Sequence, residues 1–203
     1  FYTADKSRND CVSFPFVGHM VEDKDENIWI CTEGGGLNLF DREKKTFTYF
    51  MADPDKNSIA HDNLKDIAYS AKRNKLYIGT HTGGLSIFDI PRRRFRNPYF
   101  ETPSYAVVAG DRINQMQIWK DKYLIFLTQW GSVKMDLDTE QLTPIFPSGK
   151  QYGNHSFTID SNDYIWITSG KIIYKINLNN EEDKTVFRCG QDGLGDQPIS
   201  TIR

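Results

Sequence analysis

The chain of 203 residues carries 25 Lys and Arg residues against 27 Asp and Glu residues, so its formal net charge is only -2. This length allows one or two domains, and a nearly neutral surface argues against a nucleic-acid groove or a polybasic membrane contact. No apolar run approaches the ~18 residues of a membrane-spanning helix, and the first ten residues lack the pattern of a signal peptide.

The first regular part of the chain consists of four short apolar stretches separated by polar or Gly-rich turns. Strands are predicted at 16–22, 28–32, 37–40 and 46–50. Three glycines follow the second strand, where a tight hairpin demands positive φ. Connections this short join antiparallel neighbours, because a parallel crossover needs about a dozen residues or more.

This unit returns three times along the chain. Its second strand, IWICT at 28–32, is matched by LYIGT at 76–80, LIFLT at 124–128 and IWITS at 165–169. The equivalent residues are 48, 48 and 41 positions apart, namely Trp29, Tyr77, Ile125 and Trp166. A short polar residue ends the third strand of each unit, where its side chain can bond the turn backbone; these residues are Asp41, Asp89, Asp136 and Asn177.

The second strands of the units are apolar on both faces, whereas a sheet with one face in water would alternate. No segment has the periodicity of a helix that could cover these sheets, so the sheets must cover one another. We therefore predict an all-β fold, a β-propeller of four-stranded antiparallel blades. Complete blades are expected at 16–50, 64–97, 113–146 and 155–188, within a single propeller segment of 1–203.

Both ends of the chain look like parts of further blades. Residues 1–15 resemble the tail of a preceding blade, and 199–203 resemble the first strand of a next one. The terminal sheets would then leave apolar faces uncovered. We expect a partial ring that self-associates, as in a homodimer, or forms an open arc; a strict monomer at high concentration would contradict this.

The chain also holds one dense basic run and three widely spaced cysteines. Arg92-Arg93-Arg94 with Arg96 follows FDIP, where a turn is expected, and favours a solvated turn over a phosphate site. The cysteines share no metal-type spacing, so we expect no metal and no cofactor. Cys31 is expected to be a small buried hydrophobe, and a disulfide between Cys11 and Cys189 stays open.

These units resemble the propeller repeat of two-component regulators, which has an acidic turn, aliphatic-Trp-Ile-Gly-Thr, Gly-Gly-Leu and aromatic-Asp. The stretch EDKDENIWICTEGGGLNLFD at 22–41 is a near-complete match, and LYIGTHTGGLSIFD at 76–89 follows it with Tyr for Trp. The third unit departs with TQWGSVKMD, and the fourth keeps DSNDYIWIT before a shortened SGKIIYKIN. The positions that carry the repeat are Trp29, Thr32, Gly35, Asp41, Tyr77, Thr80, Gly84, Asp89 and Trp166.

The resemblance implies the extracytoplasmic sensor region of a hybrid two-component system of the Bacteroides type. In that family, propellers precede a membrane helix, a histidine kinase and response-regulator domains. The resemblance further implies a periplasmic location, the remaining blades of the parent chain as partners, and an oligosaccharide ligand. Detection of that ligand would regulate glycan-utilisation genes through the parent's kinase.

The alternation of loops between the two rims predicts where a ligand would bind. Loops between the second and third strands share one rim with the long connections between blades, and such loops commonly carry binding residues. We expect Trp130 to stack on a sugar ring, with packing onto a neighbouring blade as the alternative. Hydroxyl groups would be bound by Gln129, His81 and Glu33. Further candidates on this rim are Tyr105, Arg112, Tyr152 and His155.

Two other classes of function are considered: a propeller enzyme, such as a glycan lyase or hydrolase, and a pure protein-interaction or dimerisation platform. Catalysis would need carboxylates or histidines that converge at one depth. The four histidines fall at unrelated positions of their units, and the carboxylates cluster in the turns of the other rim. We therefore expect no catalytic residue in this segment, and no contact with nucleic acid or membrane. The sequence does not separate a sensor from an interaction platform.

Overall fold

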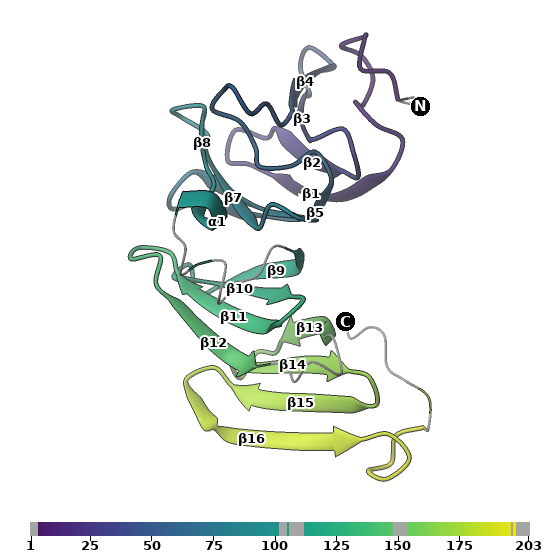
Figure 1. Ribbon diagram of the computed structural model, residues 1–203, viewed down its shortest axis with the longest axis vertical. Helices are drawn as coiled ribbons and strands as arrows, with labels where there is room; N and C mark the ends of the chain where they lie inside the picture. Colours follow the sequence, from purple (N-terminus) through teal and green to yellow (C-terminus); the bar gives the residue numbers. More distant parts are fainter. Residues whose placement is uncertain (1–3, 102–104, 106–111, 148–153, 196, 198–203) are drawn as a thin grey trace.

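The computed structural model describes residues 4–101, 105, 112–147, 154–195 and 197. Within them, four four-stranded sheets form, and each strand pairs antiparallel with its neighbours in the sequence (Figure 1). The strands of the first two sheets are β1 (Val17–Glu22), β2 (Ile28–Thr32), β3 (Leu37–Asp41), β4 (Thr46–Phe50), β5 (Leu64–Ser70), β6 (Lys75–Thr80), β7 (Leu85–Asp89) and β8 (Arg94–Arg96). Those of the last two are β9 (Ile113–Trp119), β10 (Tyr123–Thr128), β11 (Gly131–Asp136), β12 (Leu142–Pro147), β13 (Asn154–Ile159), β14 (Tyr164–Ser169), β15 (Ile172–Asn177) and β16 (Asn180–Arg188).

The four sheets are the blades of a partial β-propeller, arranged along an arc in Figure 1. Because β5 lies beside both β1 and β9, the first strand of each blade is the innermost one. The outer strand limits lie within one residue of the predicted blade limits. In the described part of the chain, helical residues occur in α1 (Pro98–Glu101), which follows β8, and at Tyr105.

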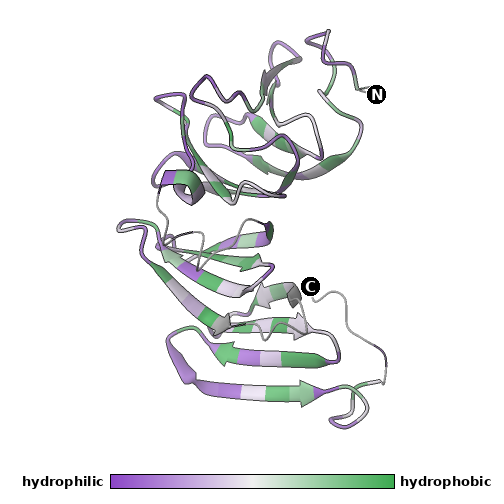
Figure 2. Cartoon of the chain, viewed as in Figure 1, coloured by the Kyte–Doolittle hydropathy of each residue, from purple (hydrophilic) through white to green (hydrophobic). Residues whose placement is uncertain are grey.

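Apolar side chains fill the spaces between neighbouring sheets, and Figure 2 shows apolar residues within the strands and hydrophilic ones in many turns. Three equivalent residues of the second strands lie in three successive interfaces. Trp29 is 2% exposed and packs on Phe88 of the second blade, with ring centroids 5.5 Å apart. Tyr77 lies in the cluster between the second and third blades, and Ile125 in that between the third and fourth. Complete burial of an apolar side chain of this kind contributes about 1.5–3 kcal/mol.

Polar side chains at one repeated position of the innermost strands link neighbouring blades. The buried Asp66 carboxylate contacts His19 Nδ1 of the first blade and accepts a hydrogen bond from Met116 N of the third at 2.6 Å. Gln115 exchanges two hydrogen bonds with the backbone of Phe157 in the fourth blade, at 2.7 and 2.9 Å. The hydrogen bond to Asp66 raises the pKa of His19. The inner edges are therefore joined by polar contacts, since these buried groups need partners.

A threonine hydroxyl closes the hairpin between the second and third strands of a blade. Thr32 Oγ1 donates to Gly36 O at 2.9 Å and accepts from Gly35 N at 3.0 Å. Thr80 Oγ1 likewise donates to Gly84 O at 2.9 Å. The repeated threonine thus satisfies backbone groups of the turn that would otherwise be buried without partners.

Two glycines of these hairpins are required by close approach and by backbone conformation. A Cβ on Gly35 would lie 2.3 Å from Ser13 Oγ. Gly84 has a φ of 66°, and a Cβ there would lie 2.7 Å from Tyr99 Cβ. Side-chain bulk is excluded at both positions, and left-handed backbone favours glycine at the second.

The aspartates that end the third strands organise the following turns. Asp41 Oδ1 accepts from Lys44 N at 2.9 Å, and Asp89 Oδ1 accepts from Arg92 N at 3.0 Å. Asp136 binds the backbone of its own turn in the same way. A short carboxylate therefore replaces water as the acceptor for the turn amides.

The residues before β1 occupy the place of an inter-blade connection. Ser13 N donates to Asn38 Oδ1 at 2.8 Å, and in the second blade Ala60 N donates to Ser86 Oγ at 3.1 Å. Asn38 and Ser86 hold equivalent positions in β3 and β7. Residues 1–3 and 199–203 of the predicted end segments lie outside the described residues.

The three cysteines are buried. Cys31 lies in the apolar cluster between the first two blades. Cys11 O accepts a hydrogen bond from Tyr49 of the first blade, and Cys189 directly follows β16 of the fourth blade. These two blades lie at opposite ends of the arc in Figure 1. A disulfide between Cys11 and Cys189 of one chain is therefore incompatible with this fold.

Candidate functional site

The hairpins between second and third strands share one rim with the connections between blades. Glu33, in the hairpin of the first blade, forms a β-bridge with Asn63 at the end of the first inter-blade connection. His81 N, in the hairpin of the second blade, donates to Asn63 O at 2.9 Å. The connection therefore runs between the two hairpins, and we call this side of the propeller the loop rim.

Charged side chains of the loop rim pair across blades. Lys65 Nζ at the start of β5 lies 3.2 Å from Glu33 Oε1. Arg112, just before β9, places Nη2 3.0 Å from His81 Nε2. Because a guanidinium only donates, His81 Nε2 is the acceptor in this contact. Glu33, His81 and Arg112, which the sequence predicted separately, are thus linked by a series of contacts through Asn63 across three blades.

Three exposed aromatic side chains lie on the same rim. The exposed fractions are 67% for Phe16, 64% for Phe100 and 50% for Trp130. Phe16 directly precedes β1, Phe100 lies in α1, and Trp130 lies in the hairpin between β10 and β11. Among the large apolar residues that are exposed in the described ranges, these three are the aromatic ones.

Sequence reasoning identified only one of these aromatic residues. It missed Phe16, which it treated as a strand residue, and Phe100, which lies in a rim connection from which it selected Tyr105 instead. The signal for Phe100 was an aromatic residue within a polar inter-blade connection, where no neighbouring strand would cover it.

Trp130 stands at the tip of a shortened hairpin. Leu127 pairs with Ser132, which leaves four residues in the turn, whereas Cys31 pairs with Leu37 across five. Trp130 N donates to Thr128 Oγ1 at 2.9 Å, which holds the backbone of the tip. Since half of the residue surface is exposed, the ring can meet a ligand while its other part is covered. Gln129 beside it is also exposed.

A pocket of about 350 Å³ opens between the first two inter-blade connections of the rim. Its lining includes Asp53 and Lys56, which form an ion pair of 2.7 Å, together with Asn97 and the exposed ring of Phe100. Its volume lies within the range of about 300–1,000 Å³ that is usual for small-molecule sites. An aromatic wall beside polar groups suits a ligand with both apolar faces and hydroxyl groups.

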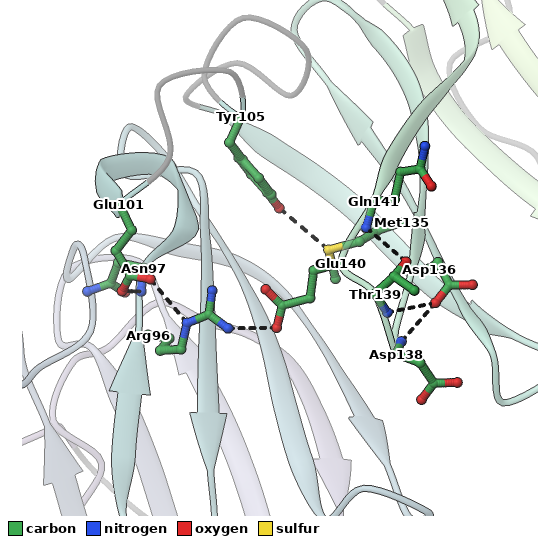
Figure 3. Close-up of polar contacts among 10 residues, drawn as sticks. All are labelled: Arg96, Asn97, Glu101, Tyr105, Met135, Asp136, Asp138, Thr139, Glu140 and Gln141. Atoms are coloured by element: carbon green, nitrogen blue, oxygen red, sulfur yellow. Dashed lines mark hydrogen bonds and ion pairs between the residues drawn. The ribbon is translucent and has the colours of Figure 1, made fainter.

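Three of the predicted rim residues are placed differently or are not described. Tyr105 is 5% exposed and its hydroxyl group lies 3.9 Å from Met135 Sδ, so the prediction of a ligand contact is wrong for this side chain (Figure 3). Its ring fills the space between the second and third blades, and burial raises the pKa of its phenol. Tyr152 lies outside the described residues, and only the backbone of His155, in β13, is described.

In the described ranges, no three His, Cys, Asp or Glu side chains gather in a way that could hold a metal ion. No helix in those ranges has the length and apolar character needed to cross a membrane.

Four-stranded antiparallel blades around a common axis define this chain as a partial β-propeller with an accessible loop rim. It matches no protein-family model, and no curated protein matches its sequence. Solved structures do resemble it. The extracellular domain of the hybrid two-component system BT3049 from Bacteroides thetaiotaomicron matches with a TM-score of 0.73 and 20% identity, over 92% of this chain and 25% of that chain.

Two further structures extend the comparison. The extracellular domain of the hybrid two-component system BT4673 from the same organism matches with a TM-score of 0.71 and 20% identity, over 93% of this chain and 26% of that one. The WD40 repeats of RRP9 match with a TM-score of 0.66 and 11% identity, over 91% and 53%. The chain thus spans about a quarter of the length of the two sensor domains, and the likeness establishes the propeller fold.

Proposed function

We propose that this chain is part of the extracytoplasmic, ligand-sensing propeller of a hybrid two-component signalling protein, and that its loop rim binds an oligosaccharide. The likeness to the extracellular domains of BT3049 and BT4673 supports the sensor role. In this proposal the propeller lies in the periplasm, and binding regulates glycan-utilisation genes through a histidine kinase of the parent protein.

The proposal of an oligosaccharide ligand rests on three exposed aromatic rings on one rim, those of Phe16, Phe100 and Trp130. Aromatic rings pack on the apolar faces of sugar rings, and nearby polar groups bind the hydroxyls. Glu33 and His81 are each held by a cation, which supports fixed recognition rather than proton transfer. We therefore propose binding without catalysis for this segment.

We also propose that the outer faces of the first and fourth blades pack against the remaining blades of the parent protein, with a second copy of the chain as the alternative. The outer face of the first blade holds an apolar groove of about 680 Å³ lined by Met20, Ile30 and Phe47, among others. Apolar surface of this kind gains free energy when another sheet covers it. Mass measurement over a range of concentrations distinguishes a homodimer from a monomer.

Calorimetric titration of the protein with a panel of neutral oligosaccharides tests the sugar site. For the oligosaccharide that binds, Trp130→Ala and Phe100→Ala are each expected to weaken the affinity by roughly tenfold, because an aromatic contact is lost. Tyr164→Ala is the matched aromatic control, since Tyr164 begins β14 beside the turn from β13, on the rim opposite to the loop rim.

Two results would contradict the proposal. Unchanged affinity in both aromatic variants would show that the ligand binds elsewhere. Hydrolysis or elimination of any oligosaccharide in the panel would favour the enzyme alternative.

A further inference from the structure

A basic pocket lies on the outer part of the second blade, on the side that faces the third. Its volume is about 440 Å³, and its charged lining residues are Lys75, Arg92, Arg94, Arg96, Asp89 and Glu101. Its apolar floor is Ile87, which is 4% exposed and belongs to the cluster between these two blades. The pocket is separate from the Phe100 pocket of the loop rim, because the two share no lining residue.

Strand register brings these side chains to one face of the blade. Lys75 of β6 pairs with Asp89 of β7, which pairs with Arg94 of β8, so the three form one row across the sheet. Arg96 follows two positions after Arg94, and Phe95 between them is buried on the opposite face. Arg94 and Arg96 are solvent-exposed, as predicted, but the prediction of a turn is wrong for them, because they lie in the strand β8. Successive residues of a strand point to opposite faces of the sheet, so Arg94 and Arg96 share one face and Phe95 lies on the other.

The edge strand that carries both arginines is held in place by an asparagine side chain. Asn57 Oδ1 accepts from Phe95 N at 2.7 Å, and Asn57 Nδ2 donates to Phe95 O at 2.8 Å. The side-chain amide thus occupies the hydrogen-bonding groups that an additional strand would use. Arg94 and Arg96 are consequently presented by a fixed backbone.

Two of the four cations are already matched by carboxylates. Arg92 pairs with Asp89 at 2.8 Å. Arg96 lies between Glu101, at 3.1 Å, and Glu140 of the third blade, at 2.7 Å (Figure 3). These pairs orient the arginines and leave the charge of the pocket to the remaining two cations.

Lys75 and Arg94 stand on either side of Asp89 in the row. Within the described ranges, neither side chain lies within ion-pair distance of a carboxylate, and each interacts with one only at longer range, Lys75 with Asp89 and Arg94 with Glu101. Two strand spacings separate their backbones, which is about 10 Å. Both cations are therefore available to a ligand that enters the pocket.

The equivalent positions in the first blade show that the repeat itself does not require these cations. Register places Asn27, Thr46 and Thr48 where the second blade has Lys75, Arg94 and Arg96. All three are neutral, although the two blades share the same strand pairing. The cations at these three positions therefore occur in the second blade and not in the first, whereas Arg92 has a counterpart in Lys44, which pairs with Asp41.

We propose that this pocket binds an organic anion through a carboxylate, sulfate or phosphate group held by Arg94 and Lys75. Guanidinium and ammonium groups form their strongest hydrogen bonds with such oxyanions. A volume of about 440 Å³ far exceeds the ~30 Å³ share of one water molecule, so the site has room for an organic group beside the anion. This site goes beyond the oligosaccharide site of the loop rim and does not depend on it.

Titrations with glucuronate, glucose 6-sulfate and glucose 6-phosphate test the site and distinguish the three anionic groups. Neutral glucose and inorganic phosphate serve as reference ligands. At least one of the three organic anions is expected to bind more tightly than both references. Arg94→Gln is expected to weaken that binding about tenfold, because a charge-assisted hydrogen bond is lost.

Arg93→Gln is the matched control, because it removes the same charge from the next position in the chain. Arg93 lies over the ring of Phe50, 5.3 Å from its centroid, and does not line the pocket. Its variant is expected to bind within about twofold of the unmodified protein. Lys75→Gln provides a second disruption if thermal unfolding shows that Arg94→Gln alters the fold.

Three outcomes would overturn the proposal. None of the organic anions binds more tightly than glucose, inorganic phosphate binds as tightly as the organic anions, or Arg93→Gln loses as much affinity as Arg94→Gln. The last result would show general attraction by surface charge rather than a built site.

Discussion

Two tryptophans at equivalent positions of the first and fourth blades have the same local structure and different surroundings. Trp29 Nε1 donates to Asp23 Oδ2 at 2.8 Å, and Trp166 Nε1 donates to Asp160 Oδ2 at 2.8 Å. In both cases the aspartate precedes the tryptophan by six residues and also accepts hydrogen bonds from the amides of its turn. The motif therefore specifies one turn and one indole orientation wherever it occurs.

The neighbouring blade makes the difference. Trp29 is 2% exposed, and its ring contacts Phe88 of the second blade. Trp166 is half-buried, stacks on Phe187 of its own blade at an interplanar angle of 12°, and lies under Lys175. Local sequence thus orients both rings, but a ring of this kind is buried only where the sheet of a neighbouring blade packs against it.

Replacing Trp29 and Trp166 in turn should give the largest difference in free energy of unfolding between the first and fourth blades. Trp29→Ala is expected to lower the free energy of unfolding by about 3–5 kcal/mol, because it leaves a cavity between two blades. Trp166→Ala should cost about 1–2 kcal/mol, since less apolar surface is lost from the folded state. Urea denaturation of both variants measures the comparison. Equal losses would mean that Trp166 is as fully covered in the intact protein as Trp29.

Replacing Asp23 and Asp160 in turn should give a smaller difference in stability, again with the larger loss in the first blade. Asp23→Ala leaves the buried indole N–H of Trp29 without its acceptor, which costs about 1–3 kcal/mol. Asp160→Ala should cost less, because water can reach the half-buried Trp166. Thermal unfolding of the two variants, with Asp23→Asn as a variant that keeps one acceptor oxygen, tests this order. A larger loss for Asp160→Ala would contradict the role assigned to burial.

The smallest expected effect is a dependence of stability on acid pH. The hydrogen bond from Trp166 is the main cause that lowers the pKa of Asp160 below its usual value of 3.8. The contribution of the Asp160 carboxylate to stability is therefore complete above the pKa of the unfolded state and is lost as the pH falls through the lower pKa of the folded state. Between pH 5 and pH 2, the free energy of unfolding, followed by tryptophan fluorescence, should fall less with decreasing pH in Asp160→Asn than in the unmodified protein. The same pH dependence in both proteins would show that this carboxylate does not couple folding to proton binding.

Much of the fold could be predicted because each blade is specified by residues close in the chain. The repeated threonine, the glycines and the aspartate after the third strand act within a few positions of one another, as the contacts of Thr32, Gly35 and Asp41 show. The candidate site was predicted in part for the same reason. Loop alternation between rims follows from strand order, which brought Glu33 and His81 to one side.

The remainder of the site depends on side chains from different blades. Tyr105 belongs to a rim connection in the sequence, yet the space between two blades receives its ring. Phe100 is exposed, whereas the phenylalanines Phe88 and Phe95 of the same blade are buried. The four arginines of the run at 92–96 look alike in the sequence. In the structure, Arg94 of the short strand β8 lines the pocket, while Arg93 in the preceding turn lies over Phe50.

The sequence by itself determined the strands, their antiparallel order, the turn chemistry and the need for sheets to cover one another, because these follow from local spacing and from apolar residues on both faces. Only the tertiary structure decided which rings are exposed on the loop rim and which cations share a pocket. It also decided which of the two tryptophans with the same hydrogen bond to an aspartate lies in a core. The physical reason is that burial and charge pairing between blades depend on residues about 30 or more positions apart, and no local pattern encodes their contact.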